Sequence, residues 1–259
     1  MRLQDRVAIV TGGAGGIGRG IVAKLLSEGA KVAIADLGEE RMRPVVDELS
    51  GEGIEVGAWQ CDVTSRDQIG AVVSSVVETF GRIDILVNTA QSFGAPGAGA
   101  AAPPPIPVAE FPDDVWDHTF DTGVKGTLYF SQAVFPHMKE QGGRIINFGS
   151  AWGQMGTEGA AAYNAAKEAI RGLSRTMARE WGVHNITVNV INPLVETTAL
   201  QQVRKQDPER VQGWLDVIPL RRFGTPEDAG KLVAFLASDE ADFITGRTMM
   251  LDGGRFLFA

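Results

Sequence analysis

Short runs of apolar, mostly β-branched residues alternate along the chain with longer amphipathic stretches. Seven of these runs have the length of strands and the continuous apolar character of strands buried on both faces. They are Val7–Val10, Lys31–Ala35, Ile54–Trp59, Ile83–Val87, Arg144–Asn147, Thr187–Ile191 and Thr248–Leu251. The alternation predicts a doubly wound α/β fold, in which helices cover both faces of a parallel sheet.

Two segments depart from this alternation. Residues 91–108 contain the run GAPGAGAAAPPPIP, whose prolines and small residues exclude a helix and a central strand. We expect a long surface loop there, either a tolerated insertion or a flap over a ligand, because such sheets bind ligands beyond the carboxyl ends of their strands. Residues 194–220 mix apolar and charged residues and predict one or two amphipathic helices. These helices would form a substrate lid, or would only pack against the core or another subunit.

Length and composition narrow the range of functions. A chain of 259 residues is expected to form one domain, residues 1–259. Its formal net charge is −8 with acids and bases interspersed, which argues against nucleic-acid binding. We find no leader pattern and no apolar run near the roughly 20 residues that span a bilayer, and we expect a cytoplasmic protein without a membrane partner. One cysteine and three scattered histidines offer no metal site, so redox chemistry would need an organic cofactor.

A glycine-rich turn follows the first predicted strand and leads directly into a helical pattern. Its sequence is Thr11-Gly-Gly-Ala-Gly-Gly-Ile-Gly18. Glycines let the backbone approach a pyrophosphate, and the helix N-terminus offers free N–H groups. A turn without a ligand is the alternative, but the position between strand and helix favours a dinucleotide site. The predicted cofactor-binding residues of the turn are Gly12, Gly16, Ile17 and Gly18.

An acidic residue, Asp36, ends the second predicted strand. Its carboxylate can accept hydrogen bonds from the adenosine ribose hydroxyls and would repel a 2′-phosphate, so NAD is the predicted cofactor rather than NADP. Asp36 could also cap the helix that begins near Glu39, and the two roles are compatible.

Candidate catalytic residues follow the fifth predicted strand. Ser150 closes that strand, and Tyr163 and Lys167 share one face of a predicted helix. We expect the lysine ammonium to lower the tyrosine pKa from about 10 toward neutrality, which would make Tyr163 a proton carrier. Ser150 would hydrogen-bond the substrate oxygen. With the glycine turn, this set predicts hydride transfer between NAD and a secondary alcohol or ketone. A non-redox or scaffold role for an NAD-binding protein, and hydrolysis by Ser150 and Lys167, remain open alternatives.

Together these motifs resemble the short-chain dehydrogenase/reductase family over nearly the whole chain, including the late Ile244-Thr-Gly and Asp252-Gly-Gly segments. The resemblance implies one Rossmann-type domain, a nicotinamide cofactor, a Ser-Tyr-Lys centre and commonly a homotetramer. It also implies further cofactor contacts, which are Asp62, Val63, Asn88, Ala90, Tyr163, Lys167, Pro193, Val195 and Thr197.

Three positions depart from the family pattern. The family usually has Asn-Asn-Ala-Gly where this chain has Asn88-Thr-Ala-Gln91, and Leu194 replaces a glycine after Pro193. Gly123 stands where the family has an asparagine that supports a proton-relay water. Glycine would permit a local helix distortion and leave room for a water held by backbone carbonyls. Because Ser150, Tyr163 and Lys167 remain, we expect activity to survive, slower or with narrower scope. Gln91 either reaches the cofactor or substrate or faces solvent.

The substrate is expected to be an apolar ketone or alcohol. Its predicted contacts are Gln91, Ser150, Trp152, Met155 and Trp214. The aromatic carboxyl end, residues 255–259, is expected to dock on this or a neighbouring subunit, so a homo-oligomer is predicted.

Overall fold

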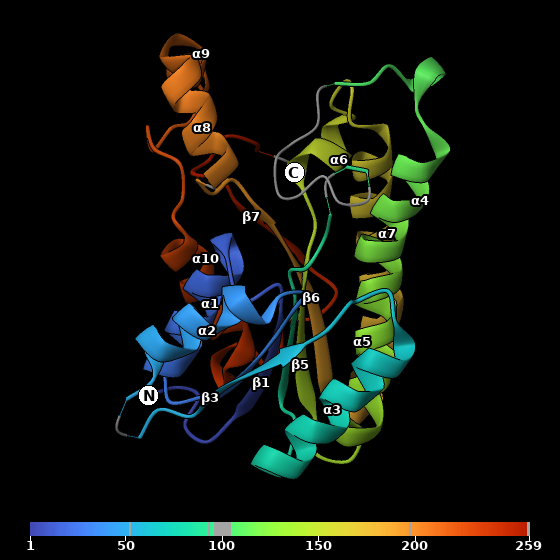
Figure 1. Ribbon diagram of the computed structural model, residues 1–259, viewed down its shortest axis with the longest axis vertical. Helices are drawn as coiled ribbons and strands as arrows, with labels where there is room; N and C mark the ends of the chain where they lie inside the picture. The colour runs from blue at the N-terminus through green and yellow to red at the C-terminus, as the bar shows by residue number, and fades with distance from the viewer. Residues whose placement is uncertain (52, 93, 96–104, 197, 258–259) are drawn as a thin grey trace.

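The computed structural model contains one seven-stranded sheet whose paired strands all run parallel (Figure 1). The structure describes residues 1–51, 53–92, 94–95, 105–196 and 198–257. The strand order is β3-β2-β1-β4-β5-β6-β7. The strands are β1 (Val7–Thr11), β2 (Lys31–Asp36), β3 (Val56–Gln60), β4 (Ile85–Asn88), β5 (Gly143–Phe148), β6 (Ile186–Pro193) and β7 (Thr248–Leu251). The predicted doubly wound fold is confirmed, and each observed strand overlaps a predicted run.

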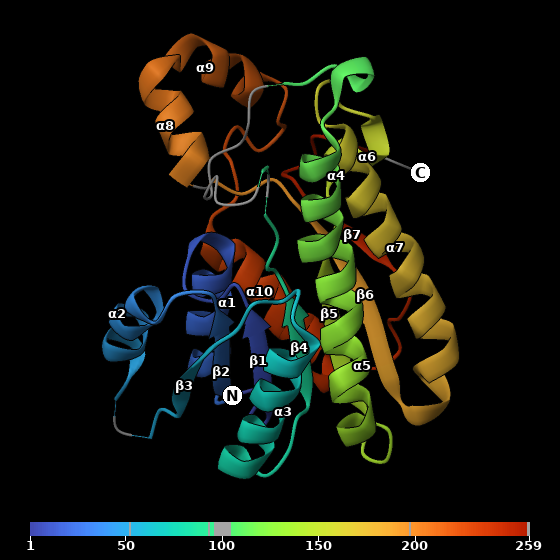
Figure 2. The same cartoon turned by 45° about the vertical axis from the view of Figure 1, so that its right-hand side comes forward.

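Helices cover both faces of the sheet (Figures 1 and 2). One face carries α1 (Gly16–Ser27), α2 (Glu39–Leu49) and α10 (Pro226–Ala237). The other carries α3 (Arg66–Phe80), α5 (Gly126–Met138) and α7 (Ala161–Trp181). The remaining α-helices of the described chain lie toward the carboxyl ends of the strands (Figures 1 and 2). They are α4 (Asp113–Phe120), α6 (Ala151–Met155), α8 (Thr198–Gln206) and α9 (Pro208–Asp216).

The two faces of the sheet support two hydrophobic cores, because successive side chains of a strand point in opposite directions. In β1, Val10 packs in the core that contains Ile21 of α1, whereas its neighbour Ile9 packs in the core that contains Phe130 of α5. Every residue of β1 is buried. This explains why the strands read as continuous apolar runs and not as alternating ones.

The helix that crosses from α4 to α5 has an irregular centre. Residues Asp121–Lys125 form a π-helical segment that joins α4 directly to α5, and Gly123 lies inside it. Such segments are uncommon and recur at functional sites. The expected helix distortion at Gly123 is therefore present.

The predicted loop over residues 91–108 is only partly described, since residues 93 and 96–104 lie outside the described residues. Its described parts contain no helix or strand until the short 3-10 helix Val108–Glu110 begins. The segment 194–220 contains α8 and α9, as the amphipathic pattern predicts. Trp214 packs there in a small cluster with Val211, Ile218 and Phe223.

Candidate active site

The glycine turn lies between β1 and α1, and its shape depends on two glycines. Gly12 has a φ of +66°, a conformation that side chains other than glycine rarely adopt. A Cβ atom at Gly18 would lie 2.2 Å from the carbonyl oxygen of Gly12. The first turn of α1 therefore sits directly against the loop, and its free N–H groups face the space above the carboxyl end of β1.

Asp36, at the end of β2, is held beside this turn. Its side chain is 6% exposed and accepts hydrogen bonds from the backbone N–H groups of Ala14, at 3.1 Å, and Leu37, at 2.8 Å. The guanidinium of Arg41 lies 3.3 Å from the same carboxylate. Helix α2 is capped by Gly38, so the alternative that Asp36 caps this helix is wrong.

A cleft of about 230 Å³ joins the glycine turn to the candidate catalytic residues. Its lining comes from the carboxyl ends of β1, β4, β5 and β6 and from α1 and α7, and consists of Gly12, Gly15, Ile17, Gly18, Thr89, Gln91, Phe148, Gly149, Tyr163, Lys167 and Pro193. Gly15, Thr89, Phe148 and Gly149 were not among the predicted site residues. Thr89 and Gly149 directly follow strands, and the rule that ligands lie beyond strand ends would have found them.

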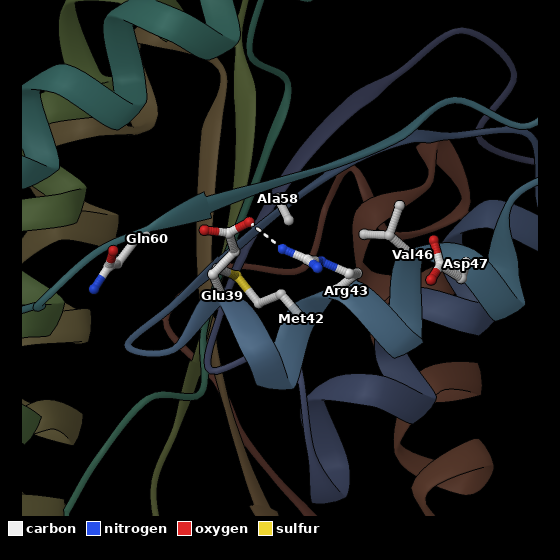
Figure 3. Close-up of a pocket in the computed structure, with 7 residues that line it drawn as sticks. All are labelled: Glu39, Met42, Arg43, Val46, Asp47, Ala58 and Gln60. Carbon is white, nitrogen blue, oxygen red and sulfur yellow. Dashed lines mark hydrogen bonds and ion pairs between the residues drawn. The ribbon is translucent and has the colours of Figure 1, made fainter.

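A second hollow, of about 290 Å³, lies over α2 and the edge strand β3 (Figure 3). It is lined by Glu39, Met42, Arg43, Val46, Asp47, Ala58 and Gln60, and the Arg43 guanidinium donates to Glu39 at 2.8 Å. This hollow shares no lining residue with the cleft and contains none of the candidate catalytic residues.

Ser150 and Tyr163 meet beside the cleft. Ser150 is the N-cap of the short helix α6, where its hydroxyl accepts from the backbone N–H of Trp152 at 3.2 Å. A hydrogen bond between Ser150 and Tyr163 lowers the tyrosine pKa, but burial raises that pKa by more, so the net shift is upward. The expected fall of the Tyr163 pKa toward neutrality is therefore wrong for the protein without ligands, because desolvation of the phenolate outweighs the favourable contacts.

Lys167 is buried one helical turn after Tyr163. Its side chain is 5% exposed, and its Nζ donates to the carbonyl oxygen of Phe148 at 2.8 Å. Burial lowers the pKa of Lys167 from 10.5 to about 7. The Nζ atom lies 5.5 Å from the centre of the Tyr163 ring. With a pKa near neutrality, this amine is able to exchange a proton close to neutral pH.

Asn88 and Ala90 hold the end of β4 in place. The Asn88 amide donates to the Asn147 Oδ1 at 2.9 Å, and the Asn147 amide donates to the Ser174 hydroxyl of α7 at 2.9 Å. The backbone N–H of Ala90 donates to the Thr11 hydroxyl at 3.1 Å. This buried chain ties β4, β5 and α7 together below the cleft, so the Asn88 side chain supports the site from within the fold.

Other predicted residues lie farther from the lining of the cleft. Asp62 accepts from the backbone N–H and the hydroxyl of Thr64, at 2.9 and 2.8 Å, which stabilises the turn after β3. Val63 packs against Gly126 at the start of α5. Val195 is buried and forms a single β-bridge with Gly224. Thr197 lies outside the described residues.

The predicted substrate contacts fall into different surroundings. Trp152 and Met155 follow Ser150 on α6, with 40% and 43% of their surfaces exposed. The Trp152 ring meets the Tyr163 ring edge-on, with the ring centres 6.2 Å apart. Trp214 instead packs within the α8–α9 cluster, with the Arg210 guanidinium over its ring.

Membrane-spanning helices and metal-binding clusters are both absent from the part of the chain that the structure describes. None of the helices in that part of the chain combines the length and apolar character needed to cross a bilayer. Nor do its histidine, cysteine and acidic side chains gather in threes that could hold a metal ion.

Comparisons with known proteins identify the family of the chain. Residues 12–255 match the family model described as Enoyl-(Acyl carrier protein) reductase. The chain is 38% identical to 12alpha-hydroxysteroid dehydrogenase of Clostridium sp., over 97% of this chain and 96% of that protein. It is 36% identical to 3-oxoacyl-[acyl-carrier-protein] reductase FabG of Thermotoga maritima, over 98% and 99%. Among solved structures, levodione reductase superposes with a TM-score of 0.88 at 30% identity, covering 98% of both chains.

The chain belongs to the short-chain dehydrogenase/reductase family. Members of this family are oxidoreductases that use nicotinamide cofactors, and the relatives named above act on hydroxyl or keto groups.

Proposed function

We propose that the protein is an NAD-dependent oxidoreductase that interconverts a secondary alcohol and a ketone. The observation that carries this proposal is that the glycine turn, Tyr163 and Lys167 line one cleft, with Ser150 hydrogen-bonded to Tyr163 beside it. The turn proposed to bind the nucleotide and the residue proposed to transfer the proton thus line the same space.

The residues of the cleft fit a dinucleotide. The close approach of Gly18 to Gly12 leaves the backbone open to a pyrophosphate, since any side chain at Gly18 would collide with the turn. The predicted contacts Gly12, Ile17 and Pro193 line the same space. When bound, the nicotinamide would supply or accept the hydride.

We assign the proton chemistry to Tyr163, Ser150 and Lys167. In ketone reduction the Tyr163 hydroxyl would give its proton to the substrate oxygen, and in alcohol oxidation the tyrosinate would take it back. Ser150 would hold that oxygen by a hydrogen bond. The raised pKa of Tyr163 keeps its proton in place before reaction, and a protonated Lys167 would stabilise the phenolate that forms.

Asp36 supports NAD as the cofactor. Its buried carboxylate lies at the turn, where a ribose hydroxyl would donate to it and a 2′-phosphate would be repelled. Arg41 forms an ion pair with this carboxylate, so the positive charge of Arg41 is partly neutralised and less able to attract a 2′-phosphate.

For the substrate we propose an apolar ketone or alcohol, possessing a rigid carbon skeleton like the steroid of the Clostridium relative. The exposed side chains of Trp152 and Met155 beside Ser150 support this choice. The backbone N–H of Ile106 donates to the Gly159 carbonyl at 3.1 Å, just before α7. This bond ties the end of the loop close to the helix that carries Tyr163, which supports the proposal that the loop is a flap over the substrate. A homo-oligomer and a cytoplasmic location remain predictions.

The test is a panel of apolar cyclic and open-chain ketones, each incubated with NADH and the protein while the absorbance of the reduced cofactor is followed. We expect turnover with wild type, none with Tyr163→Phe, and wild-type turnover with the matched control Tyr129→Phe, which removes the hydroxyl of the only other tyrosine. Nucleotide binding without turnover across the panel would contradict the proposal and favour a scaffold role.

A further inference from the structure

Gln91, the first residue of the long loop after β4, fills the space above Gly123. A Cβ atom at position 123 would lie 2.8 Å from the Gln91 Cδ, 2.9 Å from its Nε2 and 3.1 Å from its Oε1. The glutamine carboxamide therefore occupies the volume that a side chain at position 123 would need. A side chain at position 123 would therefore have to displace the Gln91 carboxamide.

The carboxamide of Gln91 has no partner among the described residues. Both its Nε2 and its Oε1 are shielded from solvent and lack a hydrogen bond within the protein. Buried amide groups are nearly always paired, with protein atoms or with an ordered water, because an unpaired one carries a desolvation cost. Both ends of this amide therefore call for a small polar partner.

The backbone beside Gln91 is tied to the π-helical segment. The next residue, Ser92, donates its backbone N–H to the Thr122 hydroxyl at 3.2 Å, and that hydroxyl donates to the His118 carbonyl at 2.8 Å. These bonds fasten the start of the loop to the π-helical segment Asp121–Lys125. The backbone next to Gln91 is thus tied to this segment, and the Gln91 side chain lies over Gly123.

The same side chain faces the catalytic cleft. Gln91 lines the cleft together with Tyr163 and Lys167, and α7, which carries both of these residues, packs against the π-helical segment. A protonated Lys167 has three N–H donors, and one of them is used by the Phe148 carbonyl. The other donors of the protonated amine remain available to a further acceptor.

The contact also joins two of the departures from the family pattern. Gln91 stands where the family usually has glycine, and Gly123 stands where it usually has asparagine. The two positions are far apart in sequence, yet their atoms are in contact.

We propose that Gln91 is a positioning residue for proton transfer: its carboxamide holds a water molecule between the π-helical segment and Lys167. The proton that Tyr163 gives to the product oxygen is then replaced from solvent through this water and the Lys167 amine, and no electron moves in the step. The kinetic part of this inference rests on the proposed function, whereas the water site itself does not.

A high-resolution crystal structure of the free protein tests the water site. We expect an ordered water within hydrogen-bonding distance of both the Gln91 carboxamide and the Lys167 Nζ in wild type, and its loss in Gln91→Leu, which keeps the size of the side chain and removes its polar atoms. A wild-type carboxamide without a water, or the same water in both proteins, would overturn the inference.

Kinetics of the same variant test its role. Gln91→Leu should lower kcat about tenfold while KM and the nucleotide Kd stay within about twofold of wild type, because proton transfer and not binding is affected. A solvent isotope effect on kcat should become larger, which a purely structural role would not produce. A raised KM with unchanged kcat would show a substrate contact instead and would refute the positioning role.

An exchange of the two side chains gives the sharpest control. Gly123→Asn alone should crowd Gln91 and lower both the melting temperature and kcat. Gln91→Gly with Gly123→Asn should regain the melting temperature and bring kcat to within about threefold of wild type. If the losses of melting temperature and kcat in the double variant were the sum of those in the single variants, the two side chains would not substitute for each other and the inference would be overturned. If wild type shows no nucleotide-dependent turnover, the proposed function fails, while the crystal structures and melting temperatures still decide the Gln91 site.

Discussion

The buried amine of Lys167 makes a quantitative prediction about stability. Burial lowers its pKa in the folded protein to about 7, from 10.5 for an ordinary lysine. The unfolded chain therefore holds this proton up to about pH 10.5, and the folded protein releases it near pH 7. Between these values the unfolded state binds more protons, so stability rises with pH. Below about pH 7 the full cost of the buried charge is present, and above about pH 10.5 it is absent.

The size of the effect follows from the linkage between pKa and free energy. Between about pH 7 and about pH 9, wild type should gain about 2 kcal/mol of unfolding free energy relative to Lys167→Met. Loss of the hydrogen bond to the Phe148 carbonyl changes the variant by an amount that does not depend on pH, so this loss cancels in the comparison. The gain is thus specific to the titration of Lys167.

Equilibrium urea unfolding of both proteins at the two pH values measures this gain. Lys205→Met, which removes an exposed lysine of α8, serves as the matched control and should show no such pH-dependent difference from wild type. If the difference between wild type and Lys167→Met were the same at both pH values, the amine would not be desolvated as its burial implies. The lowered pKa of Lys167, on which its part in the proposed mechanism depends, would then be refuted.

Three further outcomes are expected. Asp36→Ala should shift the ratio of the NAD and NADP dissociation constants toward NADP by about tenfold to a hundredfold. A charge at about 5 Å is worth about 1–3 kcal/mol, and Arg41 loses its partner in this variant. In the same Kd measurements, Asp36→Ala with Arg41→Ala should lose most of the gained NADP affinity. Ser150→Ala should lower kcat about a hundredfold with the NADH Kd nearly unchanged, and an unaltered kcat would remove Ser150 from the site. Gly18→Ala should cost about 2–3 kcal/mol in chemical unfolding and abolish nucleotide binding, because its Cβ would collide with the Gly12 carbonyl; normal stability would argue against the close approach.

Local patterns predict the central strands of the sheet well because these strands are buried on both faces. The predicted run Val7–Val10 lacks only the last residue of the observed strand Val7–Thr11, and the predicted run Thr248–Leu251 coincides with the observed strand. The third strand begins later than expected, because Ile54 forms an isolated bridge with Gly51 instead of joining β2. An apolar residue in a turn looks the same in sequence as one in a strand.

The site is predicted less completely than the fold, since contacts between distant segments decide its electrostatics. Sequence spacing places Tyr163 and Lys167 on one helical face, and both line the cleft. Spacing does not reveal how deeply either side chain is buried. Burial of Tyr163 raises its pKa, so the predicted fall of this pKa is wrong. Likewise, Gln91 and Gly123 each look like a single departure from a pattern. Only the packing of the loop on the π-helical segment shows that these two residues lie against each other.

The central claim is that a nicotinamide nucleotide lies along the glycine turn with its reactive end beside Tyr163. Calorimetric titration of the folded protein with NADH and with NADPH tests this most directly. We predict saturable binding of NADH, weaker binding of NADPH, and unchanged NADH binding by Tyr163→Phe. A folded protein that takes up neither nucleotide would contradict the account.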